Sequence, residues 1–271
     1  GRVHFTQDGG NSWNEVTKNI KGLPKGSWIP QIKASAKNKG EALLIANDYR
    51  RFNYTPYAYR TKNYGKTWER IVDEKDVASY TLSIIEDPKN PNLLFLGTDD
   101  GLYLSLNAGE SWQKWTAGFP TVSTKDLAIH PREEDLVIGT FGRAAWVLDD
   151  IRPLRAVAGN PQAIAEPFNL FAPPTAYLAA YQQPTGSRFG ADALYQGENK
   201  KYGAMITYFI KEGIKEGAKE KDDKEGDSVK SGTEDGAKGS KDSLFLKVFN
   251  GDKLIRTLGF KKPKKAGFHR M

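Results

Sequence analysis

One short motif occurs three times in the chain, at Thr6–Trp13, Thr61–Trp68 and Ser105–Trp112. Each copy reads Ser or Thr, any residue, Asp or Asn, any residue, Gly, any residue, Ser or Thr, and Trp. Asp and Asn side chains close tight turns by hydrogen-bonding the backbone two residues on, and Gly adopts the positive φ that such turns need. The tryptophan brings a large apolar surface. Three copies between strand-like runs therefore predict a repeat architecture.

The spacing of the motifs indicates units of four strands. From Asp8 to Asn63 is 55 positions, and from Asn63 to Asn107 is 44. The second step is close to the ~40–45 residues of a four-stranded propeller blade. The first step is longer by about the length of residues 47–56, which we expect to form an inserted loop. A fourth unit without the motif is expected to end near residue 148, because residues 127–148 parallel the strands of the third unit.

The motif resembles the Asp-box of BNR-type β-propellers, a group that includes sialidase-like, xyloglucanase-like and sortilin-like (VPS10-type) proteins. Thr6–Trp13 matches at every defined position, while the other two copies carry Asn in place of Asp. Residues 139–150 also look like the end of the propeller in sortilin-like bacterial exoproteins. The resemblance covers residues 1–155. It implies that the box joins the third and fourth strands of a blade and has a structural role, away from the ligand face.

A second module is expected after a Pro-rich linker at 156–176. Strand-like segments at 203–210, 243–249 and 254–258 resemble the small Ig-like sandwich that follows such propellers, as in flagellar hook-capping proteins. Residues 211–242 are dominated by Lys, Glu, Asp, Gly and Ser, and this composition predicts a disordered insertion.

The predicted fold class is therefore all-β. A partial β-propeller of four-stranded antiparallel blades with Asp-box hairpins occupies 1–155, and an incomplete Ig-like β-sandwich occupies 177–271. Because Gly1–Phe5 reads as a third strand running into the first box, the remainder of the propeller is expected upstream.

Composition excludes several function classes. The net charge of +7 is spread over the 271 residues, so it does not indicate nucleic acid binding. Cysteine is absent, which excludes disulfides, thiolate metal sites and cysteine nucleophiles. His4, His130 and His269 are far apart, and no cofactor motif occurs. No stretch approaches the ~20 apolar residues of a membrane helix. We therefore expect no cofactor, no metal, no nucleic acid and no membrane span.

The candidate ligand-binding residues are Arg50, Arg51, Tyr54, Arg143 and Trp28. In a propeller, the loops between strands two and three, and those between blades, meet at the edge that ligands usually contact. Two arginines among aromatic residues there are suited to stacking and to bidentate hydrogen bonds. The alternatives are an insertion that packs on a neighbouring blade, core packing for Trp28, and a carboxylate partner for Arg143.

Asp99 and Asp100 are the candidates for a catalytic carboxylate pair. Arg143, in the equivalent loop of the next unit, would face the propeller axis with them. The alternative is a plain hairpin turn, because Gly101 follows the two acids directly.

Two function classes remain open, because propellers host both. The first is a binding or scaffold propeller of a secreted, periplasmic or cell-envelope protein, which recognises a protein or glycan with the Ig-like module as spacer. The alternative is a glycoside hydrolase, xyloglucanase-like or sialidase-like, whose catalytic residues lie largely outside this fragment, because neither family's catalytic set maps here. An intracellular assembly factor like the plant photosystem propellers is a third class, without support in the residues.

Overall fold

The computed structural model describes residues 1–177, 200, 203–213 and 243–271. These residues form two compact units, Gly1–Pro161 and Gln162–Met271, in which β-strands dominate. From residue 214 on, the predicted charged insertion lies outside the described residues. No helix in the described ranges is both long enough and apolar enough to cross a membrane.

Unit 1 contains two complete four-stranded antiparallel sheets. Blade B consists of β3 (Trp28–Ala34), β4 (Ala42–Asp48), β5 (Asn53–Thr61) and β6 (Glu69–Arg70). Blade C consists of β7 (Thr81–Glu86), β8 (Leu94–Thr98), β9 (Gly101–Ser105) and β10 (Gln113–Lys114). Consecutive strands are neighbours in each sheet, as in the blades of a β-propeller. The predicted four-stranded antiparallel blades are confirmed.

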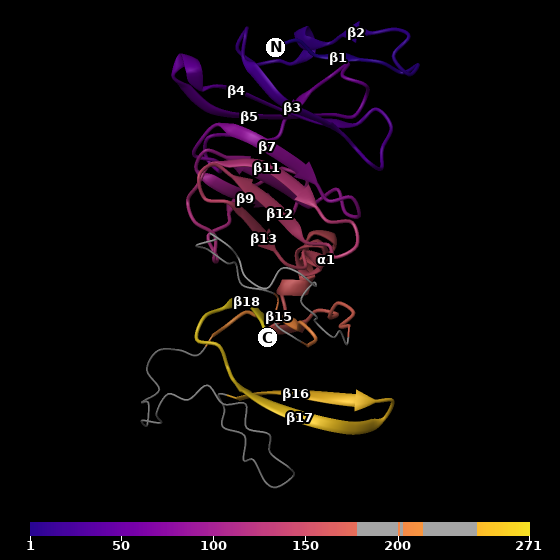
Figure 1. The fold of residues 1–271 in the computed structure, drawn as a ribbon, viewed down its shortest axis with the longest axis vertical. Coiled ribbons are helices and arrows are strands. Elements are labelled where there is room, and N and C mark those ends of the chain that lie inside the picture. Colours follow the sequence, from indigo (N-terminus) through magenta and orange to yellow (C-terminus); the bar gives the residue numbers. More distant parts are fainter. Residues whose placement is uncertain (178–199, 201–202, 214–242) are drawn as a thin grey trace, which may run out of the picture. The chain divides into compact units, whose positions relative to one another are not determined.

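In sequence, one smaller sheet precedes these two blades and another follows them. Blade A is the pair β1 (His4–Phe5) and β2 (Asn14–Glu15), and blade D is β11 (Thr124–Ile129), β12 (Leu136–Thr140) and β13 (Ala145–Leu148). In Figure 1 the indigo strands of blade A lie at the top, those of blade B lie below them, and blades C and D follow, overlapping in this view.

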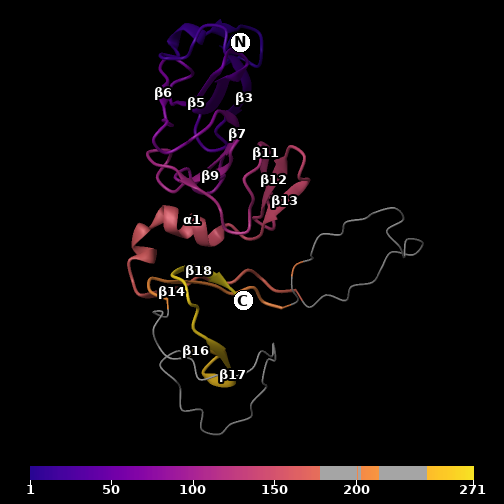
Figure 2. The ribbon, with the colours of Figure 1, turned by 90° about the vertical axis from the view of Figure 1, so that its left-hand side faces the viewer.

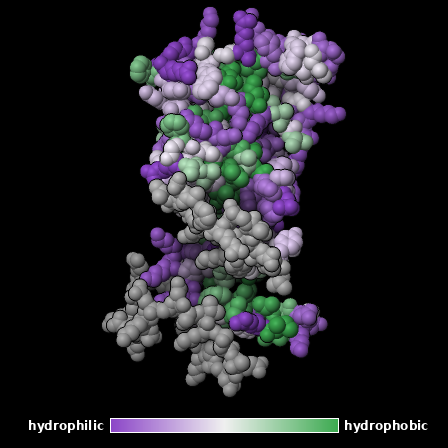
Figure 3. Space-filling model, in the orientation of Figure 1, coloured by the Kyte–Doolittle hydropathy of each residue, from purple (hydrophilic) through white to green (hydrophobic). Residues whose placement is uncertain are grey.

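The core lies between the blades, so a central blade is apolar on both faces. In β8, Leu94 and Leu96 pack against blade B, whereas Phe95 packs against blade D. Successive side chains of a strand point to opposite faces, and a strand buried on both faces therefore reads as a continuous apolar run. Figure 3 shows the surface on one side of unit 1, where separate hydrophobic patches interrupt mostly hydrophilic residues.

The extra length of blade B is not an inserted loop, as residues 47–56 were expected to be. The strand β4 continues to Asp48, a single 3-10 turn follows at Tyr49–Arg51, and β5 already begins at Asn53. Asp48 pairs with Asn53 across this turn, so the additional residues lengthen a hairpin. The turn projects at the left of Figure 1.

The three motif copies adopt the same turn. In each copy the glycine amide donates to the first hydroxyl over 2.9 Å, and the amide before the tryptophan donates to the Asp or Asn side-chain oxygen over 2.9–3.0 Å. One further hydrogen bond in the turn changes direction with the residue at its third position, which is Asp in the first copy and Asn in the others. The Ser12 hydroxyl donates to the Asp8 carboxylate, whereas the Asn63 amide donates to the Thr67 hydroxyl. The hydrogen bonds from Ser12 hold the pKa of Asp8 well below its ordinary range.

The motif turns of blades B and C each pack onto the preceding blade. The buried Trp112 indole donates to the Ile71 carbonyl over 2.7 Å, which joins blade C to blade B. Trp68 packs with Val16 in the cluster between blades A and B. Trp13 belongs to the first blade in this chain, and it is 61% exposed. The turn thus contributes to the contact between blades A and B and to that between blades B and C.

A short helix, α1 (Arg152–Gly159), follows blade D and was not expected from the sequence. Pro153 in its first turn suits a helix start, and Leu154 and Ala158 are buried in the core of blades C and D. Arg155 donates to both carboxylate oxygens of Asp87, over 2.8 and 2.7 Å, and also pairs with Glu134. In Figure 2, α1 lies against the ends of these blades.

The described residues of unit 2 form two separate sheets. β14 (Phe168–Leu170), β15 (Thr207–Ile210) and β18 (Gly267–Arg270) form a three-stranded antiparallel sheet, and β16 (Ser243–Asn250) pairs with β17 (Lys253–Lys261) as a long hairpin. The expected hairpin at Asn250–Lys253 is present. β14 arises inside the expected linker, and β18 lies where the chain was expected to lead toward a further strand. The Ig-like sandwich stays a prediction.

Our first prediction concerns the packing of the repeated turn. Gly109 and Gly10 have nearly the same φ, 95° and 100°, but a Cβ on Gly109 would lie 3.0 Å from Ile71, whereas on Gly10 the nearest atom is 3.9 Å away. Gly109→Ala is expected to cost about 2–4 kcal/mol, from the positive φ and overpacking together. Gly10→Ala is expected to cost about 1–2 kcal/mol, from φ alone. Equal losses in urea unfolding would contradict this role of the turn.

The second prediction concerns the ion pairs of α1. Arg155→Ala is expected to destabilise unit 1 by about 3–5 kcal/mol, because it leaves the fully buried Asp87 carboxylate without its cationic partner, with the Lys89 and Asn90 amides still donating to it. The control, Arg132→Ala, removes an exposed pair with Glu133 and is expected to change stability by less than about 0.5 kcal/mol. Urea unfolding of the two variants measures the difference.

The same ion pairs give this prediction a pH dependence. Burial by itself would raise the pKa of Glu134, but hydrogen bonds from Lys89 and Arg155 outweigh it and lower the pKa below its ordinary value. A lowered folded-state pKa stabilises the fold above the unfolded-state pKa, and this stabilisation is lost as the pH falls through the folded-state pKa. Acid should therefore destabilise the wild type more than Arg155→Ala. A parallel loss in both would contradict the assignment.

Candidate functional site

The sequence-predicted site residues lie along one edge of blades B to D. This hairpin edge carries the turns at 49–52, 99–100 and 141–144, together with the first residues of β3, β7 and β11. Register places them together, because Trp28 pairs with Asn47, Thr81 with Thr98 and Thr124 with Thr140. The motif turns lie at the opposite ends of the strands.

Trp28, Arg50 and Tyr54 come together there in one aromatic cluster. The Arg50 guanidinium carbon lies 5.3 Å from the Trp28 ring centroid and 5.9 Å from that of Tyr49. Tyr49 stacks on Tyr80 at 4.7 Å, and Tyr54 lies 6.1 Å from Tyr80. Cation–π contact with two rings fixes the orientation of the guanidinium, while its N–H donors stay available at its rim.

Tyr80 links the cluster to Asp99, a contact that the sequence analysis did not foresee. Burial, and then the hydrogen bond and charge of Asp99, raise the pKa of Tyr80 to about 12. The hydroxyl therefore keeps its proton at neutral pH and donates a hydrogen bond to the Asp99 carboxylate. One signal for Tyr80 was present in the sequence, namely its position. It directly precedes the first strand of blade C, and Trp28 begins the first strand of blade B.

Asp100 binds different residues from Asp99. Its carboxylate accepts hydrogen bonds from Lys114 over 2.6 Å and from the Tyr103 hydroxyl over 3.3 Å. Asp99 and Asp100 form the two-residue turn between β8 and β9, with Gly101 at a φ of 123°. This geometry is that of the hairpin-turn alternative.

Arg51 and Arg143 differ from Arg50. The Arg51 guanidinium donates to the Asp48 carboxylate over 2.7 Å and to the Lys25 carbonyl over 2.8 Å, and so ties the turn to the loop before β3. The Arg143 carbonyl accepts a hydrogen bond from the Trp146 indole over 2.9 Å. Among the described residues, no contact joins the Arg143 side chain to the aromatic cluster.

Two exposed phenylalanines also lie on this edge, and neither was among the candidate ligand-binding residues. Phe52 is 84% exposed and has a φ of 61°, and its amide donates to the Tyr49 carbonyl over 2.9 Å. Phe141 is 73% exposed, with the Lys125 ammonium 5.5 Å from its ring centroid. A large apolar residue inside a polar turn was the available signal for both.

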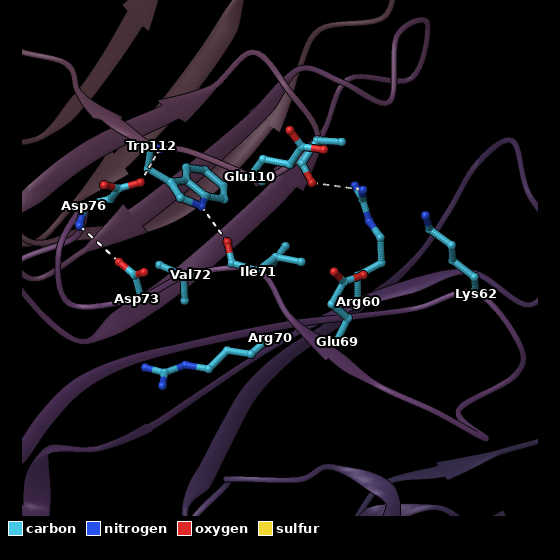
Figure 4. A pocket seen from close by; sticks show the side chains of 12 residues that line it. Arg60, Lys62, Glu69, Arg70, Ile71, Val72, Asp73, Asp76, Glu110 and Trp112 are labelled. Atoms are coloured by element: carbon cyan, nitrogen blue, oxygen red, sulfur yellow. Dashed lines mark hydrogen bonds between the residues drawn. The ribbon is translucent and has the colours of Figure 1, made fainter.

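A cleft of about 390 Å³ lies elsewhere, between blades B and C, beside the motif turn. Figure 4 shows Trp112 in its wall, with Arg60, Arg70 and Asp73 around it. The polar groups of this cleft mostly bind one another or the backbone. Arg60 is 5% exposed and pairs with two buried carboxylates, of Glu41 and Glu86. We therefore assign the cleft to the contact between blades.

The described residues contain no group of three or more His, Cys, Asp or Glu side chains that would hold a metal ion.

Comparison with known proteins supports a propeller. Residues 57–150 match the Sortilin-Vps10 family, described as sortilin, neurotensin receptor 3. These residues span most of blades B to D. The repeated blades and this match together define a β-propeller protein. No curated protein matches the chain.

Solved structures with similarity include two GH74 enzymes and YCF48. The GH74 enzyme of Niastella koreensis is 18% identical with a TM-score of 0.39, covering 45% of this chain and 21% of its own. The GH74 xyloglucanase from Xanthomonas campestris is 19% identical with a TM-score of 0.41, covering 51% and 24%. YCF48 from Cyanidioschyzon merolae is 16% identical with a TM-score of 0.26, covering 47% and 58%. The chain thus spans less than a quarter of either GH74 enzyme.

A third prediction separates the two neighbouring arginines. Arg51→Ala is expected to speed hydrogen exchange at the Phe52 amide by at least about tenfold, because a lost hydrogen bond to a charged group costs about 1.5–3 kcal/mol. Arg50→Ala is the matched control and should leave that exchange nearly unchanged, because Arg50 stacks on rings and does not tie the turn. If both variants loosen the turn equally, Arg51 has no special role in holding it.

Proposed function

We propose that this chain is part of a ligand-binding propeller that recognises a protein or a glycan at the hairpin edge. The observation that carries the proposal is Arg50, exposed and stacked against Trp28 and Tyr49. Within the described part of the chain, no hydrogen bond or ion pair involves its guanidinium. A preorganised cation of this kind loses little side-chain entropy on binding, which favours affinity.

The protein is secreted, periplasmic or held in the cell envelope in this proposal, and the partial sortilin-type match supports that location. In the same proposal, unit 2 is an Ig-like module that acts as attachment or spacer. The ligand is a protein or glycan, and no cofactor takes part.

Glycoside hydrolysis is the second candidate, with less support from the geometry. A hydrolytic pair needs one carboxyl group as acid and another as base or nucleophile, both facing the substrate. Asp100 instead binds Lys114 and Tyr103, and Asp99 accepts a hydrogen bond from Tyr80. In this proposal, any catalytic residues lie largely outside this fragment.

The test is a combined glycan and peptide array probed with the full-length protein. For each ligand found, Arg50→Ala and Trp28→Ala are expected to weaken binding by about tenfold or more, as loss of central Arg and Trp contacts does. Arg132→Ala, at the other ends of the strands, is the control and should leave binding unchanged.

Binding that survives both Arg50→Ala and Trp28→Ala would contradict the proposed site. Turnover of xyloglucan or sialosides that disappears in Asp99→Asn or Asp100→Asn would instead establish the hydrolase.

A further inference from the structure

The hairpin edge carries the two most exposed large hydrophobic side chains of unit 1. Phe52 is 84% exposed and Phe141 is 73% exposed, whereas Trp13 follows at 61%. Single exposed hydrophobic residues are ordinary on protein surfaces. Here two lie on the same edge, each in the turn between the second and third strands of its blade.

The backbone at Phe52 is costly in a way that packing does not explain. A φ of 61° is rare for a bulky side chain, and Asn or Gly would adopt it with less strain. The exposed ring gains almost no contact from this conformation. Strain of this kind concentrates at functional sites, where the surrounding structure holds it. The hydrogen bond from the Phe52 amide to the Tyr49 carbonyl supplies that support, together with the contacts of Arg51 with Asp48 and Lys25.

Positive charge surrounds the two rings. Arg50 lies two residues before Phe52, and the Lys125 ammonium lies above the ring of Phe141. Of the acids on this edge, Asp48 pairs with Arg51 and Asp100 pairs with Lys114. The available charge on this edge therefore favours an acidic partner.

The shape of the site favours a protein over a glycan. A sugar ring stacks on an open aromatic face, but Arg50 occupies one face of Trp28, and Tyr49 stacks on Tyr80. Phe52 has no hydrogen-bonding group to offer a sugar, and it projects from a turn. A projecting apolar ring is suited to a concave apolar pocket, and such pockets belong to folded proteins.

We infer that the partner is a folded protein whose surface has an apolar pocket rimmed by Asp or Glu. Phe52 enters the pocket, and Arg50 pairs with the acidic rim. Phe141 and Lys125 make the second contact of the same kind on blade D. This inference rests on the proposed function, since it names the class of ligand bound at the hairpin edge.

The experiment places the photo-crosslinking residue p-benzoylphenylalanine in the full-length protein, in the cells that make it. It replaces Phe52 in one variant and Phe141 in a second. A third variant carries it at Trp13, an exposed aromatic residue in a motif turn, as the control. The expected result is one protein crosslinked from both phenylalanine positions and not from Trp13.

The crosslinked protein is then purified and its affinity for the full-length protein is measured. Phe52→Ala and Arg50→Glu are each expected to weaken binding at least tenfold, and binding should weaken as salt increases. Phe52→Asn relieves the strained backbone, so it should keep or raise the melting temperature while binding falls at least tenfold. This variant separates lost binding from lost folding.

Three results would overturn the inference: no protein crosslinked above the Trp13 control, an affinity unchanged in Phe52→Ala, or array glycans whose binding needs Arg50 but not Phe52. The last result leaves the proposed function intact and assigns the edge to glycans. The proposed function itself fails only if no ligand of either class depends on Arg50 or Trp28.

Discussion

The contact between a motif turn and the blade before it joins the first three blades of unit 1. Trp112 closes this contact by donating to the Ile71 carbonyl, and Gly109 lets the turn approach Ile71 closely. The turn is held by its own hydroxyl, amide or carboxylate groups, so its shape does not depend on the blade it covers. The turns on blades B and C therefore share one shape, and each places its tryptophan against the preceding blade, although only the Trp112 indole has a hydrogen-bond partner there.

Because these contacts lie at one end of the strands, they leave the other end free to vary. The turns of the hairpin edge differ in length and composition, with Tyr49–Phe52 in blade B and only Asp99–Asp100 in blade C. In blades B and C the second and third strands, which form each hairpin, are the central strands of a four-stranded sheet. A turn between them can therefore carry exposed aromatic and charged side chains without weakening the core. This division explains why the cleft beside Trp112 and the aromatic cluster around Arg50 have different roles.

Local chemistry was predictable from the sequence, and contacts between distant residues were not. The blades followed from motif spacing and from apolar runs such as that of β8, and blade topology placed Trp28, Arg50 and Tyr54 on one edge. The helix α1 was missed, because it depends on burial of Leu154 and on Arg155 reaching Asp87, 68 positions away in sequence. The strand around Asn53 was missed because its polar residues resemble a loop until pairing with Asp48 is known.

The two arginines of the β4–β5 turn show why residue type alone does not identify a site. Arg50 and Arg51 are adjacent and both exposed, yet one stacks on rings and the other ties Asp48 to the Lys25 carbonyl. The second role makes the first effective, because a turn fixed by Arg51 presents Arg50 and the strained Phe52 in one orientation. Binding then loses less conformational entropy than it would with a mobile loop. The cost of the strained backbone at Phe52 is met within the free protein, before any ligand arrives.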